Sequence, residues 1–223
     1  MEIRRGAPDR ADLDGRRQLD ADPRAVVGEI GLDRWILERA RPDDPRLAGL
    51  KRASLAEQDE AFRWQLALAA ERGRPASVHC LEAWGALSAA LAETPRPPAG
   101  VLLHAYGGPV ELIASYARLG AYFSFNGHRL GAPAGSARAD RFQALVRAFP
   151  EERLLVETDA PAMPLPGERR RFPLPARADG TEVAHPADLA AAQAALAELR
   201  GAEPAALEGC LERNFHALFG LDR

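Results

Sequence analysis

The chain has 223 residues, a net charge of −3, 47% hydrophobic residues and 27% charged residues, which is the composition of one globular domain with a sizeable core. The near balance of charge excludes a global field that would attract nucleic acid, although a local basic groove remains compatible with it. No uncharged apolar run is long enough to span a bilayer, and the opening residues lack the apolar core of a signal peptide. Two cysteines, Cys80 and Cys210, exclude a disulfide framework. We therefore expect a cytoplasmic protein with no membrane contact.

In chain order, residues 1–23 form a polar N-terminal arm in which Leu13 and Leu19 allow a short helix. Short apolar runs then predict strands, and apolar residues at helical spacing predict helices. The strands are expected at 26–33, 75–80, 100–104, 121–126 and 153–159; the helices at 47–72, 83–93, 109–119, 139–149, 186–199 and 203–219, the last interrupted at Gly209. This alternation predicts a single α/β domain over residues 1–223 with a parallel sheet. A long loop rich in Pro, Gly and Arg spans 160–185, and loops of that length are usually functional or mobile.

Four chemically active residues each end a predicted strand: Glu29, His79, His104 and Asp159. The carboxyl ends of parallel strands share one face of the sheet, where active sites are built. One histidine after a strand is more often a structural polar residue than a ligand. Two histidines and two acids placed alike instead favour a site for one or two divalent metal ions with nitrogen and oxygen ligands. The sequence does not choose between Mg²⁺, Mn²⁺ and Zn²⁺.

Basic residues elsewhere give weaker signals. His128 and Arg129 directly follow the fourth predicted strand and are candidates for contact with a substrate. The cluster 169–171 of three arginines lies in the long loop and is more readily explained as solvated loop than as a phosphate-binding patch.

Several segments resemble the sequence signatures of the TatD-related metal-dependent DNases. The Gly-Glu-Ile-Gly-Leu-Asp signature matches residues 28–33, and the Glu-Thr-Asp-x-Pro signature matches residues 157–161. Weaker matches lie at 78–80, 103–108, 122–127 and near the C-terminal end. Because the order and spacing of these motifs agree, the resemblance covers the chain from about residue 25 onward.

The resemblance implies a (β/α)₈ TIM barrel of the metal-dependent amidohydrolase type. It also implies that Glu29 bridges two metal ions, that His79 and His104 hold one of them, and that Asp159 binds the other and takes the proton of the attacking water. Glu157 would lie behind these ligands. The implied activity is hydrolysis of phosphodiester bonds in DNA, as a DNase or exonuclease.

The chain departs from the family pattern at its start. The family has an N-terminal Asp-x-His-x-His strand, but no two of the five histidines here are two residues apart. The five predicted strands, which end about 30 residues apart, are too few for a barrel of eight. We therefore expect the chain to correspond to about strands four to eight of the barrel. An open five-stranded α/β domain is the alternative. Free edges at the strands of Val26 and Val156 would then favour self-association. Two further functions stay open: an inactive scaffold, and a related hydrolase of amide or other ester bonds.

Overall fold

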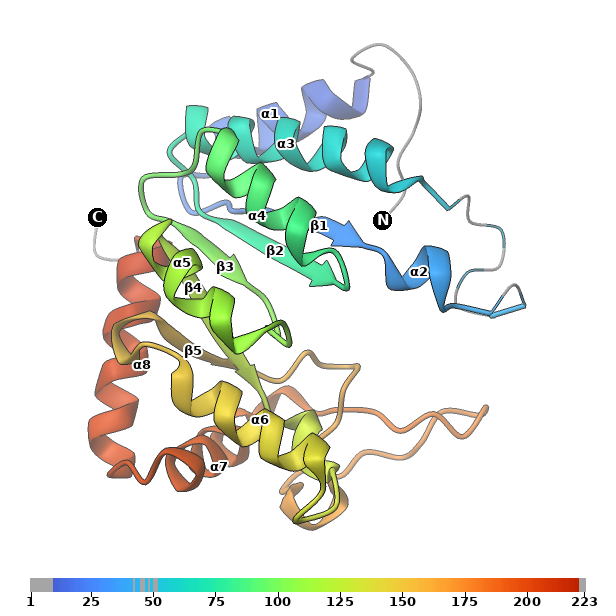
Figure 1. The fold of residues 1–223 in the computed structure, drawn as a ribbon, viewed down its shortest axis with the longest axis vertical. Coiled ribbons are helices and arrows are strands. Elements are labelled where there is room, and N and C mark those ends of the chain that lie inside the picture. Colours follow the sequence, from blue (N-terminus) through green and yellow to red (C-terminus); the bar gives the residue numbers. More distant parts are fainter. Residues whose placement is uncertain (1–9, 42, 45–46, 48, 50–51, 221–223) are drawn as a thin grey trace. The chain divides into compact units, whose positions relative to one another are not determined.

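The computed structural model describes residues 10–220 except 42, 45–46, 48 and 50–51, and it is an α/β fold with parallel strands (Figure 1). The chain divides into two compact units. The first unit contains the chain up to His104, Arg118–Ala121 and the residues from Ala217 onward; the second contains Ala105–Ala117 and Tyr122–His216.

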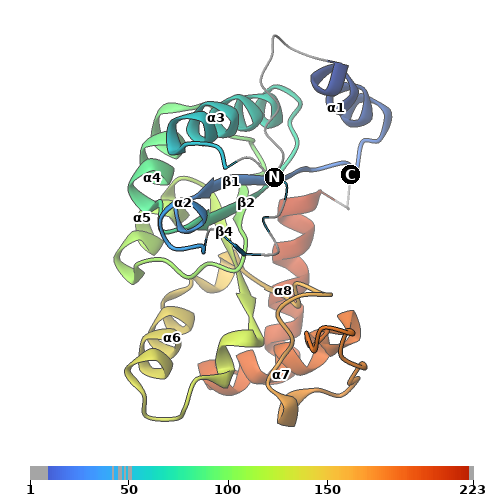
Figure 2. The same cartoon turned by 90° about the vertical axis from the view of Figure 1, so that its right-hand side faces the viewer.

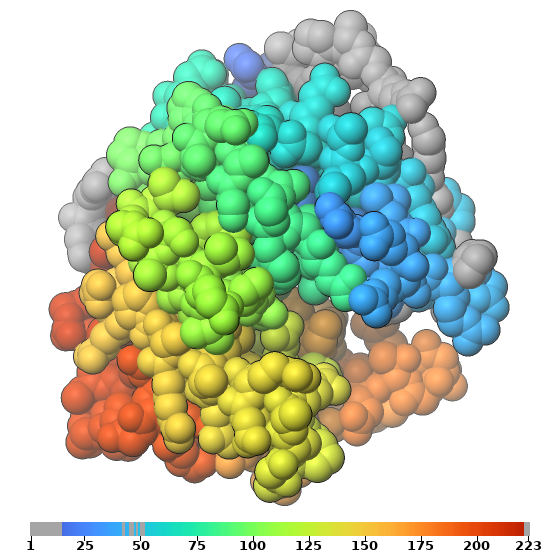
Figure 3. Space-filling view, viewed as in Figure 1, coloured from blue at the N-terminus to red at the C-terminus, as the bar shows by residue number. Residues whose placement is uncertain are grey.

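The strands of the first unit are β1 (Val27–Asp33), β2 (Ala76–Leu81) and β3 (Val101–Leu103). They pair in parallel in chain order, β1 with β2 and β2 with β3. Four helices accompany them: α1 (Arg10–Ala21), α2 (Trp35–Glu38), α3 (Leu55–Glu71) and α4 (Trp84–Glu93). Helices α3 and α4 pack against β1 and β2 and against each other (Figure 2). In the space-filling view these two helices form a continuous surface over the strands (Figure 3).

Helix α3 begins later than the predicted residue 47 because a capping box fixes its start. The side chain of Ser54 accepts a hydrogen bond from the backbone N–H of Glu57, and the carboxylate of Glu57 accepts one from the backbone N–H of Ser54. These two bonds satisfy amides that would otherwise lack partners at a helix start. The hydrophobic face of the helix then buries Phe62 and Leu66 completely.

Replacing Ser54 with alanine should lower the free energy of unfolding by about 1 kcal/mol, because the cap at the start of α3 is lost. Chemical denaturation measures this change. Ser136 offers a matched comparison, since its hydroxyl accepts the N–H of Ala139 at the start of helix α6 (Ala137–Ala148). An unchanged midpoint for Ser54→Ala would mean that the capping box does not stabilise the first unit.

The second unit is built around strands β4 (Ala121–Asn126) and β5 (Leu154–Glu157), which pair in parallel with Asn126 opposite Glu157. Its helices are α5 (Ile113–Arg118), α6 (Ala137–Ala148), α7 (Leu189–Arg200) and α8 (Pro204–Phe219). Short 3-10 helices cover Val110–Leu112, Gly127–Gly131, Glu151–Arg153, Gly167–Arg169 and Pro186–Asp188; they are labelled η2 to η6 in this order. The core is aromatic: Phe123 stacks on Phe149 with ring centroids 5.2 Å apart, and Phe125 stacks on Phe142.

All five predicted strands are confirmed, and the long loop 160–185 holds no strand and only the short helix η5. The predicted break at Gly209 is wrong, because α8 runs through it. Leu207, Cys210 and Leu211 are buried on either side of this glycine, so tertiary packing outweighs the roughly 1 kcal/mol that glycine costs inside a helix. Of the predicted N-terminal arm, residues 1–9 lie outside the described residues, and the remainder forms α1 as the two leucines allowed. In the described part of the chain, no helix is long and apolar enough to cross a membrane.

Candidate metal centre

The register of β1 and β2 places His79 between two carboxylates. Gly31 lies opposite His79, with Glu29 and Asp33 two positions before and after it on β1. Side chains two residues apart on a strand point to the same face. A Cβ atom on Gly31 would lie 1.9 Å from the carbonyl oxygen of His79, so the close approach of the two strands requires glycine here. The ring nitrogens of His79 consequently face Glu29 (Nδ1 to Oε1, 3.1 Å) and Asp33 (Nε2 to Oδ2, 3.7 Å).

The contacts of His79 with Glu29 and Asp33 also shift the pKa values of these three side chains. Burial by itself lowers the pKa of His79, but the carboxylates of Asp33 and Glu29 outweigh it and raise this pKa to about 9. The hydrogen bond with His79 lowers the pKa of Glu29, and the charge of His104 lowers it further. The pKa of Asp33 is also lowered: burial opposes the shift, but the contact with His79 and the backbone N–H of Ile36 prevail. The cluster therefore holds two carboxylates in their charged form at neutral pH.

His104 stands at the carboxyl end of β3, where its backbone N–H donates to the carbonyl of Val78. Its charge acts on Glu29. The predicted positions of Glu29 and His79 at the ends of their strands are wrong, because the pairing of β1 with β2 continues beyond them to Asp33 and Leu81. Asp159 belongs to the second unit, two residues after the end of β5, with a left-handed backbone (φ 55°). That all four side chains meet in one centre stays a prediction.

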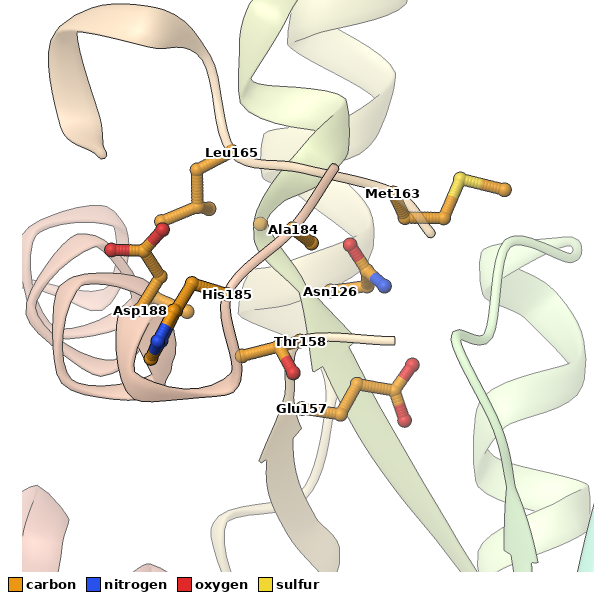
Figure 4. Close-up of a pocket in the computed structure, with 10 residues that line it drawn as sticks. Asn126, Glu157, Thr158, Met163, Leu165, Ala184, His185 and Asp188 are labelled. Atoms are coloured by element: carbon orange, nitrogen blue, oxygen red, sulfur yellow. The ribbon is translucent and has the colours of Figure 1, made fainter. Parts of the chain in front are cut away.

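Glu157 and Asn126 end their strands at the mouth of a small pocket of the second unit (Figure 4). The pocket has room for about one water molecule. Its other lining residues come from η3, the residue after β5, the long loop, η6 and α7: Gly127, Thr158, Met163, Leu165, Ala184, His185, Asp188 and Ala192. Asn126 is only 8% exposed. Its Oδ1 accepts the backbone N–H of His128, while its Nδ2 has no hydrogen-bond partner among the described residues. Asn126, which lines this pocket, therefore has one buried donor that no described residue satisfies.

His128 and Arg129 lie in η3, directly after β4. The exposed ring of His128 contacts the carbonyl oxygen of Pro164 through Nδ1 at 2.9 Å. The side chain of Arg129 is half-buried. The contact of both residues with substrate stays a prediction.

Two site residues were not identified from the sequence. Asp33 was not identified because its contact with His79 depends on strand pairing. The even spacing of Glu29 and Asp33 along the strand did indicate that their side chains share one face. Asn126 was not identified because its pocket is closed by the long loop 160–185. The sequence of this loop has no periodic pattern from which its position could be predicted.

The donor chemistry of the first-unit cluster suits a divalent metal ion. Imidazole and carboxylate together bind Zn²⁺, Mn²⁺ or Fe²⁺, and the Nδ1 of His79 and the Oε1 of Glu29 are already in contact at 3.1 Å. Within the described ranges, however, no group of three or more His, Cys, Asp or Glu side chains has a geometry that could hold a metal ion. The residues whose chemistry and contact both suit a metal ion are therefore Glu29 and His79.

Parallel strands that alternate in sequence with helices place the protein in the α/β class, to which barrels of the amidohydrolase type belong. The chain belongs to the TatD family: the model described as "TatD related DNase" matches residues 7–220.

Relatives agree with this membership, and a solved structure agrees with the fold. The chain is 34% identical to the 3'-5' ssDNA/RNA exonuclease TatD of Klebsiella pneumoniae, over 92% of this chain and 68% of that protein. It is 29% identical to the uncharacterized metal-dependent hydrolase YabD of Bacillus subtilis, over 71% and 56%. The crystal structure of the TatD homolog YjjV of Escherichia coli superposes with a TM-score of 0.72 at 24% identity, covering 96% of this chain and 71% of that one. For several further TatD relatives the chain spans between 52% and 59% of their length.

Proposed function

We propose that this protein is a metal-dependent hydrolase of phosphodiester bonds that acts on single-stranded nucleic acid. The observation that carries the proposal is the position of His79 between Glu29 and Asp33 on the paired strands β1 and β2, in a chain of the TatD family. The name of the Klebsiella relative, a 3'-5' ssDNA/RNA exonuclease, supports nucleic acid as the substrate and removal of terminal nucleotides as the reaction.

In this proposal Glu29, His79 and His104 would hold a divalent ion, and Asp159 would be a ligand of a second ion. A bound ion of this kind lowers the pKa of a water molecule to about 7 and neutralises charge on phosphoryl oxygens. Asp33 keeps the ring of His79 in position through the Nε2 contact. Asp159 accepts the proton of the attacking water as general base, and Glu157, two residues earlier, lies behind it.

A non-catalytic member of the family is the second candidate. It is favoured by the lack of a three-donor group among the residues that the structure describes. Such a protein would bind nucleic acid or a partner without cleaving a bond, and hydrolysis assays separate the two candidates.

The test is cleavage of end-labelled single-stranded DNA and RNA by the chelator-treated chain, with Mg²⁺, Mn²⁺ or Zn²⁺ added back. We expect cleavage only with an added divalent ion. By titration calorimetry, His79→Ala should weaken binding of that ion at least tenfold, because one of its ligands is removed. His216→Ala is the control, since His216 lies in α8, where its ring faces Glu212. Cleavage without any ion, or no cleavage together with ion binding that His79→Ala leaves unchanged, would contradict the proposal.

A further inference from the structure

Arg129 is a cation whose side chain has no partner within the described residues. Its guanidinium makes no hydrogen bond and no ion pair there, although the side chain is half-buried in η3. Burial and the charge of Arg138 lower the pKa of Arg129, so its surroundings disfavour the positive charge. A buried charge without compensation is costly, and an anion at this position would relieve that cost.

Other half-buried arginines of the second unit have partners. Arg169 pairs with Glu198 at 2.9 Å, and Arg170 places two nitrogens on the carboxylate of Glu182. Arg200 donates to the carbonyl oxygens of Val146 and Phe149. These contacts explain the arginines as structural, whereas nothing in the described part of the chain explains Arg129 in that way.

Gly107 provides the space in which the guanidinium lies. A Cβ atom on Gly107 would come within 2.1 Å of both terminal nitrogens of Arg129 and 2.4 Å of its central carbon. Any other residue at 107 would therefore displace the guanidinium. Because glycine has no side chain, the guanidinium lies directly beside the backbone of residue 107.

The position of Arg129 connects it with the proposed reaction. It follows β4 by three residues, and the last residue of β4, Asn126, lies opposite Glu157 of β5. The chain leaving β5 carries Asp159. Arg129 and Asp159 thus stand on the connections that leave the carboxyl ends of two neighbouring parallel strands in the same unit. Active sites in this architecture are built from such connections.

We propose that Arg129 is a phosphate-binding residue of the nucleic-acid site, held in its binding position by the absence of a side chain at Gly107. This inference rests on the proposed function for the identity of the substrate. A guanidinium presents its donors in a planar fork that matches two oxygens of a phosphate. The ligand is a backbone phosphate of single-stranded nucleic acid, and Arg129 reads no base.

The experiment measures binding without hydrolysis, by fluorescence anisotropy of a labelled single-stranded DNA oligonucleotide with the full chain in EDTA. Arg129→Gln should weaken binding about tenfold, since the charge-assisted hydrogen bonds between the guanidinium and the phosphate are lost. The slope of log affinity against log salt concentration should also fall by about 0.7, the contribution of one phosphate contact on a single strand. Arg213→Gln, an exposed arginine of α8 with the same change of charge, should leave both quantities nearly unchanged.

A second variant tests the space rather than the charge. Gly107→Ala keeps every charge but should weaken binding several-fold, because its methyl group displaces the guanidinium. Gly85→Ala is its control, since a Cβ at Gly85 meets no atom within 4 Å. Circular dichroism establishes that each variant is folded.

The outcomes separate this inference from the proposed function. Unchanged affinity and salt slope in Arg129→Gln would overturn the inference, even if the metal-dependent cleavage assay succeeds. Equal losses in Arg129→Gln and Arg213→Gln would overturn it too, because they would show general electrostatic attraction. Absence of binding by the unaltered chain would also overturn it. Loss confined to Arg129→Gln and Gly107→Ala would support it even if the chain cleaves nothing.

Discussion

Replacing Asp159 with asparagine should reduce hydrolysis of single-stranded nucleic acid by about 10³-fold. Asparagine keeps the shape of aspartate, but its amide cannot accept a proton at neutral pH, and a positioned general base contributes roughly 10²- to 10⁴-fold. The negative charge that would hold the second ion is lost as well. Cleavage rates at saturating Mn²⁺ measure the effect.

The backbone at residue 159 makes asparagine a better replacement than alanine. Asp159 has φ 55°, a left-handed conformation that asparagine and aspartate adopt more readily than other residues with a Cβ atom. Alanine would combine loss of the carboxylate with backbone strain, so a loss of activity would have two explanations. Asparagine leaves the conformation of the loop after β5 as it is.

Asp179→Asn is the matched control for this variant. Asp179 is exposed in the long loop and accepts the backbone N–H of Thr181, a contact that an asparagine oxygen also makes. We expect wild-type rates for this control and unchanged thermal melting for both variants. If Asp159→Asn keeps more than about a tenth of the wild-type rate, another group removes the proton.

The order of strands and helices was predictable because each strand is a short apolar run between polar or glycine-rich turns. The position of His104 directly after β3 was predictable for the same reason, whereas Glu29 and His79 were predicted at strand ends and lie inside β1 and β2. The mutual distances of these residues were not predictable, because strand pairing joins residues about fifty positions apart. The contact of Asp33 with His79 arises only from the register that sets Gly31 opposite His79.

The environment of Arg129 could not be predicted from the residues taken one at a time. The sequence placed Arg129 after a strand and made it a candidate for contact with substrate. The same would be predicted for any exposed arginine that follows a strand. Its distinctive features are its half-burial, its lack of a partner in the described chain, and the space left by Gly107, twenty-two positions earlier. Each of these is a property of packing between distant segments. Helix α8 illustrates the same point, since burial on both sides of Gly209 overrode its local tendency to break the helix.

Replacing Phe123 with alanine should lower the free energy of unfolding of the second unit by about 3–5 kcal/mol. Phe123 is fully buried in β4. Its ring stacks on Phe149, with centroids 5.2 Å apart, and meets the edge of Tyr106 at 5.3 Å. Removal of the ring loses both aromatic contacts and leaves a cavity in a close-packed region. A loss of this size is a large part of the roughly 5–15 kcal/mol that stabilises a typical domain.

The aromatic residues of the chain allow the change to be followed in the second unit. Its three tyrosines, Tyr106, Tyr116 and Tyr122, all belong to that unit, whereas the tryptophans at 35, 64 and 84 all belong to the first. Near-ultraviolet circular dichroism reports the packing of such rings, so the tyrosine signal should disappear at a clearly lower urea concentration in Phe123→Ala. Phe215→Ala removes the same atoms from a side chain that is 43% exposed in α8, and it should shift the tyrosine transition little, because partly solvated rings contribute less burial. Equal shifts for the two variants would mean that the stacked rings around Phe123 are not the main source of stability in the second unit.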